Sequence, residues 1–305
     1  MPKLSLAGIF PPIPTPFGAD GEVDHDRLQD NFERWNEEQL AGYVVCGSNG
    51  EYAYLTPDER VELIRVSRQA IPDGRLLIAG SGMESTQQTI DLTCRMAGAG
   101  ADAAIVVTPC YYRGGMTAAA LVRHYRQVAD ASPVPVVLYS VPANTGIDLP
   151  AQAAITLAKH PNIIGMKDSG GDVAKIGYMA HETRGDDFQI LAGSAGFLLG
   201  ALAVGAVGGV CALANIAASR LIRLWESFMR GKAMEARGQQ LPLIEVNTAV
   251  TSRFGVPGLK AAMDMLGYYG GPVRPPLMPL PEEDKATLRK ILEKAELYHE
   301  NNSSP

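Results

Sequence analysis

Short apolar segments alternate with longer amphipathic segments along most of this chain. Eight apolar runs have the length and composition of buried strands, at residues 8–13, 42–46, 76–79, 103–107, 134–139, 163–166, 190–192 and 207–211. Between them, apolar residues recur at helical spacing, as Leu28, Phe32 and Trp35 do. Strands and helices that alternate with a repeat of roughly thirty residues predict parallel β-α-β units. Eight such units predict an α/β fold with a closed (β/α)8 TIM barrel.

The helix signals also predict how the chain is divided. Thr56-Pro57-Asp58-Glu59 is a capping box with proline at the first helical position, which predicts a helix start. Further helices are expected at residues 24–40, 85–99, 117–131, 150–160, 173–183, 217–229, 232–249, 258–266 and 282–300. The last helices exceed what a barrel needs. We therefore expect a catalytic barrel over residues 1–224 and a C-terminal helical region over 225–305.

Composition narrows the class of protein. The 305 residues are 46% hydrophobic and 20% charged, which is typical of an ordinary globular protein with a large core. A net charge of -6 without a basic cluster disfavours nucleic acid as a partner. The four cysteines lie far apart and form no C-x-x-C pair, which favours reduced thiols and a cytoplasmic protein.

One uncharged stretch imitates a membrane span. No charged residue lies between Asp187 and Arg220. Gly, Ala and Ser dominate this stretch and Gly208-Gly209 interrupts it, so a helix followed by a buried strand explains it better than a transmembrane helix. The first residues after Met1 leave no room for a signal peptide, and no membrane association is expected.

Lys167 stands where the sixth apolar run leaves the predicted core. Pro161 and the pair Gly170-Gly171 bound this run. A desolvated amine is a good nucleophile at neutral pH, and Schiff-base chemistry with a carbonyl substrate needs one. The alternative is a lysine whose ammonium extends to water.

Other strand ends carry polar residues that suit the same chemistry. In a TIM barrel, the C-terminal ends of the strands meet at one face. The candidates there are the loop Gly47-Ser48-Asn49-Gly50-Glu51, which suits a backbone nest for a carboxylate, the adjacent Tyr111 and Tyr112, Tyr139, and the loop Gly193-Ser194-Ala195-Gly196. Each alone fits a tight turn or an amphipathic core residue. Together with Lys167 they predict a carbon–carbon lyase, an aldolase that acts on 2-oxo acids.

Metal and cofactor chemistry are not expected. The five histidines, His25, His124, His160, His181 and His299, fall outside the strand ends and form no pair with ligand spacing. No G-x-G-x-x-G motif follows the first predicted strand, which disfavours a nicotinamide cofactor. A catalytically silent barrel that serves as a regulatory binding module remains an alternative, although it need not keep both Lys167 and Tyr139.

These residues make the chain resemble the dihydrodipicolinate synthase/N-acetylneuraminate lyase superfamily of class I aldolases. The resemblance extends from residues 7–12 to 254–260 and 267–272. Its motifs are residues 47–51, Tyr139 with Pro142, and residues 165–169. A narrower resemblance to the 4-hydroxy-2-oxoglutarate aldolases lies in three segments, residues 108–113, 139–146 and 191–197.

The resemblance implies roles for individual residues. It implies that Lys167 forms the Schiff base, that Tyr139 is the general acid and base, and that Ser48 and Tyr111 complete a proton relay. It also implies that Tyr111 reaches the active site of a neighbouring subunit, in a homotetramer built from two dimers. The substrate-binding residues expected on the same grounds are Ser48, Asn49, Asn144, Ser169, Gly193 and Ser194.

Two departures from the synthases bear on the substrate. The resemblance places a threonine in the synthases where this chain has Asn49, and an arginine that binds the second substrate's carboxylate where it has Asn144. We therefore expect cleavage of 4-hydroxy-2-oxoglutarate to pyruvate and glyoxylate, with Ser169 and Asn49 near the shorter carboxylate. The alternatives are condensation of pyruvate with aspartate semialdehyde and cleavage of a 2-keto-3-deoxy sugar acid.

Overall fold

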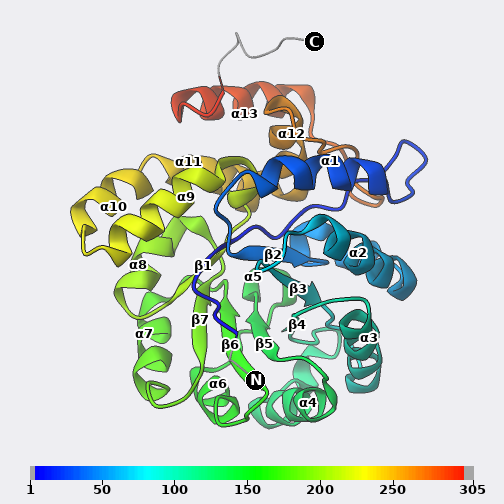
Figure 1. Ribbon diagram of the computed structural model, residues 1–305, viewed down its shortest axis with the longest axis vertical. Helices are drawn as coiled ribbons and strands as arrows, with labels where there is room; N and C mark the ends of the chain where they lie inside the picture. The colour runs from blue at the N-terminus through cyan, green and yellow to red at the C-terminus, as the bar shows by residue number, and fades with distance from the viewer. Residues whose placement is uncertain (1–3, 299–305) are drawn as a thin grey trace.

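The computed structural model describes residues 4–298, and its strands form a single parallel sheet that curls into a barrel (Figure 1). The strands are β1 (Gly8–Phe10), β2 (Gly42–Val45), β3 (Leu76–Gly80), β4 (Ala103–Val107), β5 (Val136–Ser140), β6 (Ile163–Asp168), β7 (Gln189–Ala192) and β8 (Gly208–Val210). They lie in the order β1-β8-β7-β6-β5-β4-β3-β2, with every neighbouring pair parallel. The predicted (β/α)8 TIM barrel is confirmed.

The barrel closes between β1 and the C-terminal half of β2. Strand β1 ends at Phe10, earlier than predicted, because two prolines follow it and proline has no N–H to donate. The chain beyond still pairs with β2: Ile13 N donates to Val44 O at 3.0 Å, and Val44 N donates to Pro11 O at 3.0 Å. The remaining seven strands lie within two residues of their predicted ends.

The helices around the barrel are α1 (His25–Asn36), α2 (Pro57–Ala70), α3 (Thr86–Gly98), α4 (Ala118–Ala131), α5 (Pro142–Thr145), α6 (Ala151–Leu157), α7 (Val173–Glu182), α8 (Leu198–Ala203) and α9 (Ala214–Met229). Six of them, α1 to α4, α6 and α7, begin within one residue of their predicted starts, whereas α9 begins three residues early and the short helix α5 was not predicted. The capping box of α2 is present: Glu59 N donates to the Thr56 hydroxyl at 3.2 Å, and Thr56 N donates to the Glu59 carboxylate at 2.7 Å.

The uncharged stretch before Arg220 folds into the wall of the barrel. It contains β7, α8, β8 and the start of α9. Among residues 4–298, no helix is both long and apolar enough to span a membrane.

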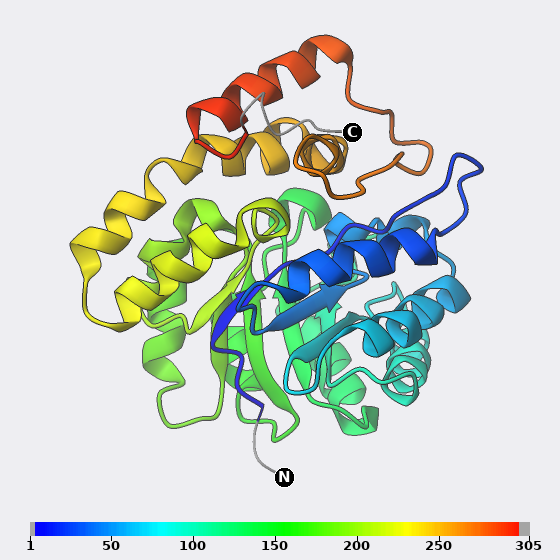
Figure 2. The same ribbon diagram turned by 45° about the horizontal axis from the view of Figure 1, so that its top comes forward.

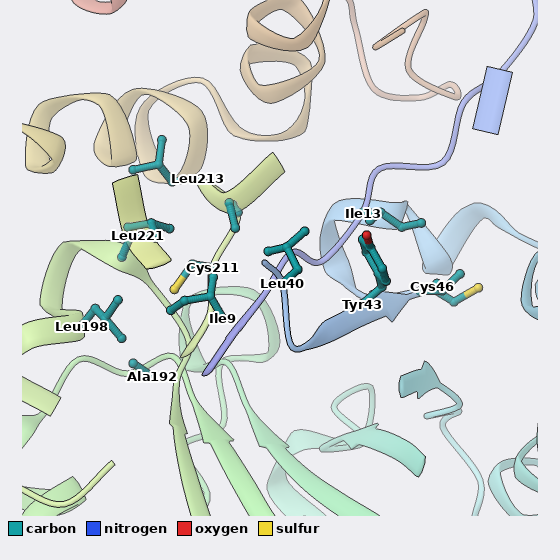
Figure 3. Close-up of a cluster of buried hydrophobic side chains, with 14 of the residues drawn as sticks. Ile9, Ile13, Leu40, Tyr43, Cys46, Ala192, Leu198, Cys211, Leu213 and Leu221 are labelled. Carbon is teal, nitrogen blue, oxygen red and sulfur yellow. The ribbon is translucent and has the colours of Figure 1, made fainter. Parts of the chain in front are cut away.

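Two apolar layers hold the barrel together, because successive side chains of a strand point to opposite faces. The inner layer fills the barrel and includes Phe10, Ile78, Val137, Ile164 and Val210. The outer layer packs the strands against the helices. Figure 3 shows part of it, with Ile9, Ala192 and Cys211 from the barrel wall and Leu198 and Leu221 from α8 and α9.

The last helices gather at one end of the barrel (Figure 2). They are α10 (Ala233–Gln240), α11 (Leu243–Thr248), a π-helical turn (Ala249–Arg253), α12 (Gly255–Met265) and α13 (Glu282–Lys294). The single helix predicted over 232–249 is wrong, because Pro242 lacks the N–H of a helix interior and separates α10 from α11. The predicted helix 282–300 ends at Lys294, and its residues 299 and 300 lie outside the described part of the chain.

The proposed boundary between residues 224 and 225 falls inside α9, which continues to Met229. The division into a barrel over 1–224 and a helical region over 225–305 therefore remains a proposal. Residues 1–3 and 299–305 of these two regions are outside the described part.

Candidate active site

Lys167 and Tyr139 lie side by side at the C-terminal end of the barrel. They are partners in the register between β5 and β6, so both side chains project from the same face of the sheet. Lys167 Nζ lies 4.1 Å from the centroid of the Tyr139 ring. Each residue is only 5% exposed. Lys167 is therefore a buried amine beside a phenol and does not extend to solvent.

The surroundings of Tyr139 make its hydroxyl easier to deprotonate. Burial by itself raises the pKa of this phenol, but the charge of Lys167 and hydrogen bonds from Ser48, Lys167 and Ser169 outweigh it, and the pKa lies below its usual value. The Ser48 hydroxyl lies 3.2 Å from the Tyr139 hydroxyl. A buried phenol with a lowered pKa can exchange a proton with a substrate at neutral pH.

The loop after β2 presents an unused donor. Cys46 and Glu51 both have left-handed backbone conformations, with φ of 59° and 54°, and they flank the turn Ser48–Gly50. Such strained residues often cluster at ligand sites. The Asn49 side-chain nitrogen is buried and has no hydrogen-bond partner among the described residues. It is available to a carboxylate oxygen of a ligand.

A cavity of about 530 Å³ lies next to Lys167 and Tyr139. It is lined by side chains from several strand ends, including Ser48, Tyr52, Glu84, Cys110 and Asn144. A smaller pocket, of about 10 Å³, is lined by Ser48, Tyr139 and Lys167 and shares Ser48 and Tyr52 with the cavity. The cavity is large enough for a small organic acid.

Several other predicted residues lie around the same end of the barrel. Asn144 is exposed on α5 and lines the cavity. Ser169 follows β6, and its hydroxyl packs so closely on Gly193 that a Cβ there would lie 2.0 Å from it. The Ser169 Cα and the Asp168 carbonyl oxygen would lie 2.7 and 2.8 Å from the same Cβ, so a side chain at Gly193 requires a backbone shift. The Ser194 hydroxyl accepts a hydrogen bond from the Asn247 side chain at 3.0 Å, which ties this loop to α11. Substrate binding by these residues remains a prediction.

Tyr111 lies apart from the buried pair within its own chain. It is 79% exposed and contacts Tyr112 edge to face, with ring centroids 5.1 Å apart. Its loop is anchored by Glu84, whose carboxylate accepts hydrogen bonds from the backbone N–H of Cys110 at 3.0 Å and of Tyr111 at 2.9 Å. Glu84 belongs to none of the sequence motifs, although its position shortly after β3 is a usable signal.

Within residues 4–298, no three His, Cys, Asp or Glu side chains are grouped so that they could hold a metal ion. Cys46, Cys94, Cys110 and Cys211 are all free thiols.

The chain is similar over most of its length to known proteins. The family model described as the dihydrodipicolinate synthetase family matches residues 5–295. A 4-hydroxy-tetrahydrodipicolinate synthase from Methanoculleus marisnigri is 35% identical over 93% of this chain and 98% of its own length. An uncharacterized DapA-like lyase from Halobacterium salinarum is 37% identical over 95% of this chain and 94% of its own length.

Solved structures show the same fold. A dihydrodipicolinate synthase from Bacillus anthracis superposes with a TM-score of 0.91 at 29% identity, over 95% of this chain and 99% of the other. A prophage protein of the dihydrodipicolinic acid synthase family from E. coli K12, in complex with pyruvate, gives a TM-score of 0.89 at 31% identity, over 96% of this chain and 99% of the other. These relatives carry synthase or lyase names, so the narrower resemblance to 4-hydroxy-2-oxoglutarate aldolases remains a prediction. The chain belongs to the dihydrodipicolinate synthetase family, and it is a lyase of the class I aldolase type.

Proposed function

We propose that this enzyme cleaves 4-hydroxy-2-oxoglutarate to pyruvate and glyoxylate through an imine on Lys167. The observation that supports this proposal best is the buried contact between Lys167 Nζ and the Tyr139 ring, at 4.1 Å. An amine held in a pocket next to a phenol of lowered pKa has the two groups that retro-aldol cleavage requires.

The proposed reaction conserves atoms and charge at each step. The neutral Lys167 amine attacks C2 of the substrate, and the Tyr139 phenol gives its proton to the oxygen that leaves as water, which produces a protonated imine and a Tyr139 phenolate. Tyr139, as phenolate, takes the proton of the C4 hydroxyl while the C3–C4 bond breaks, and the bonding electrons move into the enamine. Glyoxylate departs, and Tyr139 returns the proton to C3 of the enamine, which restores the protonated imine and the phenolate. Water then attacks the imine carbon, Tyr139 takes up the released proton, and pyruvate and the free lysine leave.

The loop after β2 supports the placement of the substrate. In the proposal, Ser48 and Asn49 hold the carboxylate next to the ketone, and Ser169 and Asn49 lie near the carboxylate of the glyoxylate portion. The unpartnered Asn49 amide supports this role. Gly193, Ser194 and Asn144 complete the proposed binding surface.

A relay through a second subunit is part of the proposal. Ser48 is hydrogen-bonded to Tyr139, and Tyr111 from a neighbouring chain would continue the relay. Two adjacent exposed tyrosines, Tyr111 at 79% and Tyr112 at 75%, fit a surface covered by another copy of the chain. We propose a homotetramer in the cytoplasm, and the four free thiols are compatible with a reducing compartment.

Condensation of pyruvate with aspartate semialdehyde is a second candidate. The names of several relatives favour it, including the synthase that is 35% identical. A structural observation also keeps it open. The Arg113 guanidinium packs against Gly146, and a Cβ on that glycine would lie 2.8 Å from it. The charged guanidinium of Arg113 therefore lies close to the segment that contains Asn144, whose own side chain is neutral.

Two measurements on one preparation test the proposal. Pyruvate with borohydride should leave one reduced adduct, on Lys167, and Lys167→Arg should be inactive because guanidinium stays protonated. The value of kcat/KM for cleavage of 4-hydroxy-2-oxoglutarate should exceed the values for the condensation and for cleavage of 2-keto-3-deoxygluconate. A larger value for the condensation overturns the proposal in favour of the second candidate.

A further inference from the structure

Arg60 is a buried cation next to the pocket that contains Lys167. It belongs to α2, yet only 2% of the residue is exposed. Its side chain lines the small pocket together with Ser48, Tyr139 and Lys167. Arginine is rarely buried to this extent unless a carboxylate pairs with it.

Neutral groups surround the guanidinium. It donates to the carbonyl oxygens of Gly80 and Gly82 and to the Met83 sulfur at 3.1 Å, and it lies 5.2 Å from the centroid of the Tyr52 ring. Its Nε has no hydrogen-bond partner, and no carboxylate within residues 4–298 forms an ion pair or hydrogen bond with it.

The two titratable neighbours of Arg60 do not supply a negative charge. Burial raises the pKa of the Cys46 thiol to about 12 and that of the Tyr52 phenol to about 12. Both groups are protonated at neutral pH. The positive charge of Arg60 therefore has no internal partner in the free protein, which is costly for a buried ion.

We propose that Arg60 is the counter-charge for the carboxylate of the 2-oxo acid and makes this pocket selective for anionic ketones. The unpartnered amide of Asn49 and the Ser48 hydroxyl stand on the loop that lines the same pocket and supply hydrogen bonds. Arg60 supplies the charge that these neutral donors lack. In a site of low dielectric, such an attraction acts without direct contact.

This inference rests on the proposed Schiff base at Lys167 and not on the identity of the product aldehyde. It differs from a purely structural role, in which Arg60 only tethers the carbonyl groups of Gly80 and Gly82 at the end of β3. A tether would support every ketone equally. A counter-charge favours the anion alone.

The test compares a charged and an uncharged ketone. Pyruvate and methyl pyruvate carry the same carbonyl, but only pyruvate is an anion. With cyanoborohydride at low ketone concentration, the rate of adduct formation on Lys167 is measured by intact mass for the wild type, Arg60→Gln and Arg60→Lys. Arg60→Gln keeps a donor for the carbonyl groups without the charge, and Arg60→Lys keeps the charge.

We expect Arg60→Gln to lower the pyruvate rate about tenfold to a hundredfold and to change the methyl pyruvate rate less than about twofold. Arg60→Lys should retain a clear preference for pyruvate. Equal losses for both ketones in Arg60→Gln would show a tether and overturn the inference. An unchanged pyruvate rate in Arg60→Gln, or a loss of preference in Arg60→Lys as large as in Arg60→Gln, would show that the charge is not responsible and would overturn it as well. If Arg60→Gln does not fold, Arg60→Met replaces it as the uncharged variant, with the same expected loss for pyruvate alone. Failure of the wild type to trap pyruvate would instead overturn the Schiff-base proposal.

Discussion

Glu51 and Lys260 form a buried ion pair that joins the C-terminal helices to the loop after β2. Lys260 Nζ lies 2.6 Å from Glu51 Oε1, and both side chains are 1% exposed. Lys260 also donates to Pro272 O at 2.7 Å and lies 4.5 Å from the centroid of the Phe17 ring. The second carboxylate oxygen of Glu51 accepts a hydrogen bond from Arg274 N at 2.8 Å. Helix α12 therefore fixes the turn that carries Ser48 and Asn49.

Removal of this lysine should damage both stability and substrate binding. Lys260→Met leaves the Glu51 carboxylate buried without its cation, which typically costs about 3 to 5 kcal/mol. We expect a loss of that size in the free energy of unfolding from urea titration, and a higher KM for the 2-oxo acid, because the turn is less well fixed.

A matched control separates this pair from surface pairs. Lys294 and Glu245 are 2.6 Å apart but 74% and 51% exposed, so Lys294→Met should cost less than about 1 kcal/mol. Adding Glu51→Gln to Lys260→Met should recover part of the loss, because it removes the orphaned charge. Equal effects of the two lysine substitutions would contradict the role assigned to the buried pair.

Tyr139→Phe should lower kcat by about two to four orders of magnitude and leave the fold intact. The substitution removes the hydroxyl that lies 3.2 Å from Ser48 and keeps the ring that packs against Lys167. Tyr125→Phe is the matched control. Tyr125 is also buried, but its hydroxyl donates to Val106 O at 3.1 Å, so its loss should affect stability and not turnover. Near-native turnover of Tyr139→Phe would assign proton transfer to another group.

The sequence was informative where strands end and uninformative where helices contribute buried charges. Parallel strands covered on both faces are continuous apolar runs, so Lys167 and Tyr139 were conspicuous as polar residues at the ends of such runs. Arg60 and Lys260 lie in helices, where a charged residue normally faces solvent, and nothing local shows that these two are buried. The partner of Lys260 is far away in the sequence, so only the fold reveals the pair.

His124 should make the fold less stable in mild acid. Burial lowers the pKa of its imidazole to about 4, although nearby Glu84 opposes this effect. The ring Nδ1 lies 2.9 Å from the Thr86 hydroxyl, and the buried Nε2 has no partner among the described residues. A histidine in the unfolded chain has a pKa of about 6.5, so the unfolded state takes up the proton first as pH falls. The contribution of the neutral His124 ring to the free energy of unfolding is therefore fully present above the unfolded pKa, and it is lost as pH falls from there to about 4.

The loss in the free energy of unfolding that is due to His124 amounts to about 3 kcal/mol at pH 4. Urea unfolding at several pH values between 7.5 and 4 measures it, with His124→Gln as the comparison. The variant should be less stable than the wild type at neutral pH and should lose less stability on acidification. Identical pH profiles for the two proteins would show that His124 is not the group responsible.

Asn144 offers the sharpest test of substrate choice, because it lines the cavity from α5 and carries no charge. A guanidinium at this position can bind a carboxylate through two hydrogen bonds, which an amide cannot match. Asn144→Arg should therefore raise kcat/KM for condensation of pyruvate with aspartate semialdehyde at least about tenfold, while cleavage of 4-hydroxy-2-oxoglutarate does not improve. Arg113→Gln, made in the wild-type background, tests whether the guanidinium beside Gly146 already binds that carboxylate. If it does, the Arg113→Gln substitution should suppress the condensation. A wild-type enzyme that condenses faster than it cleaves and gains nothing from Asn144→Arg would show that Asn144 does not exclude the longer substrate.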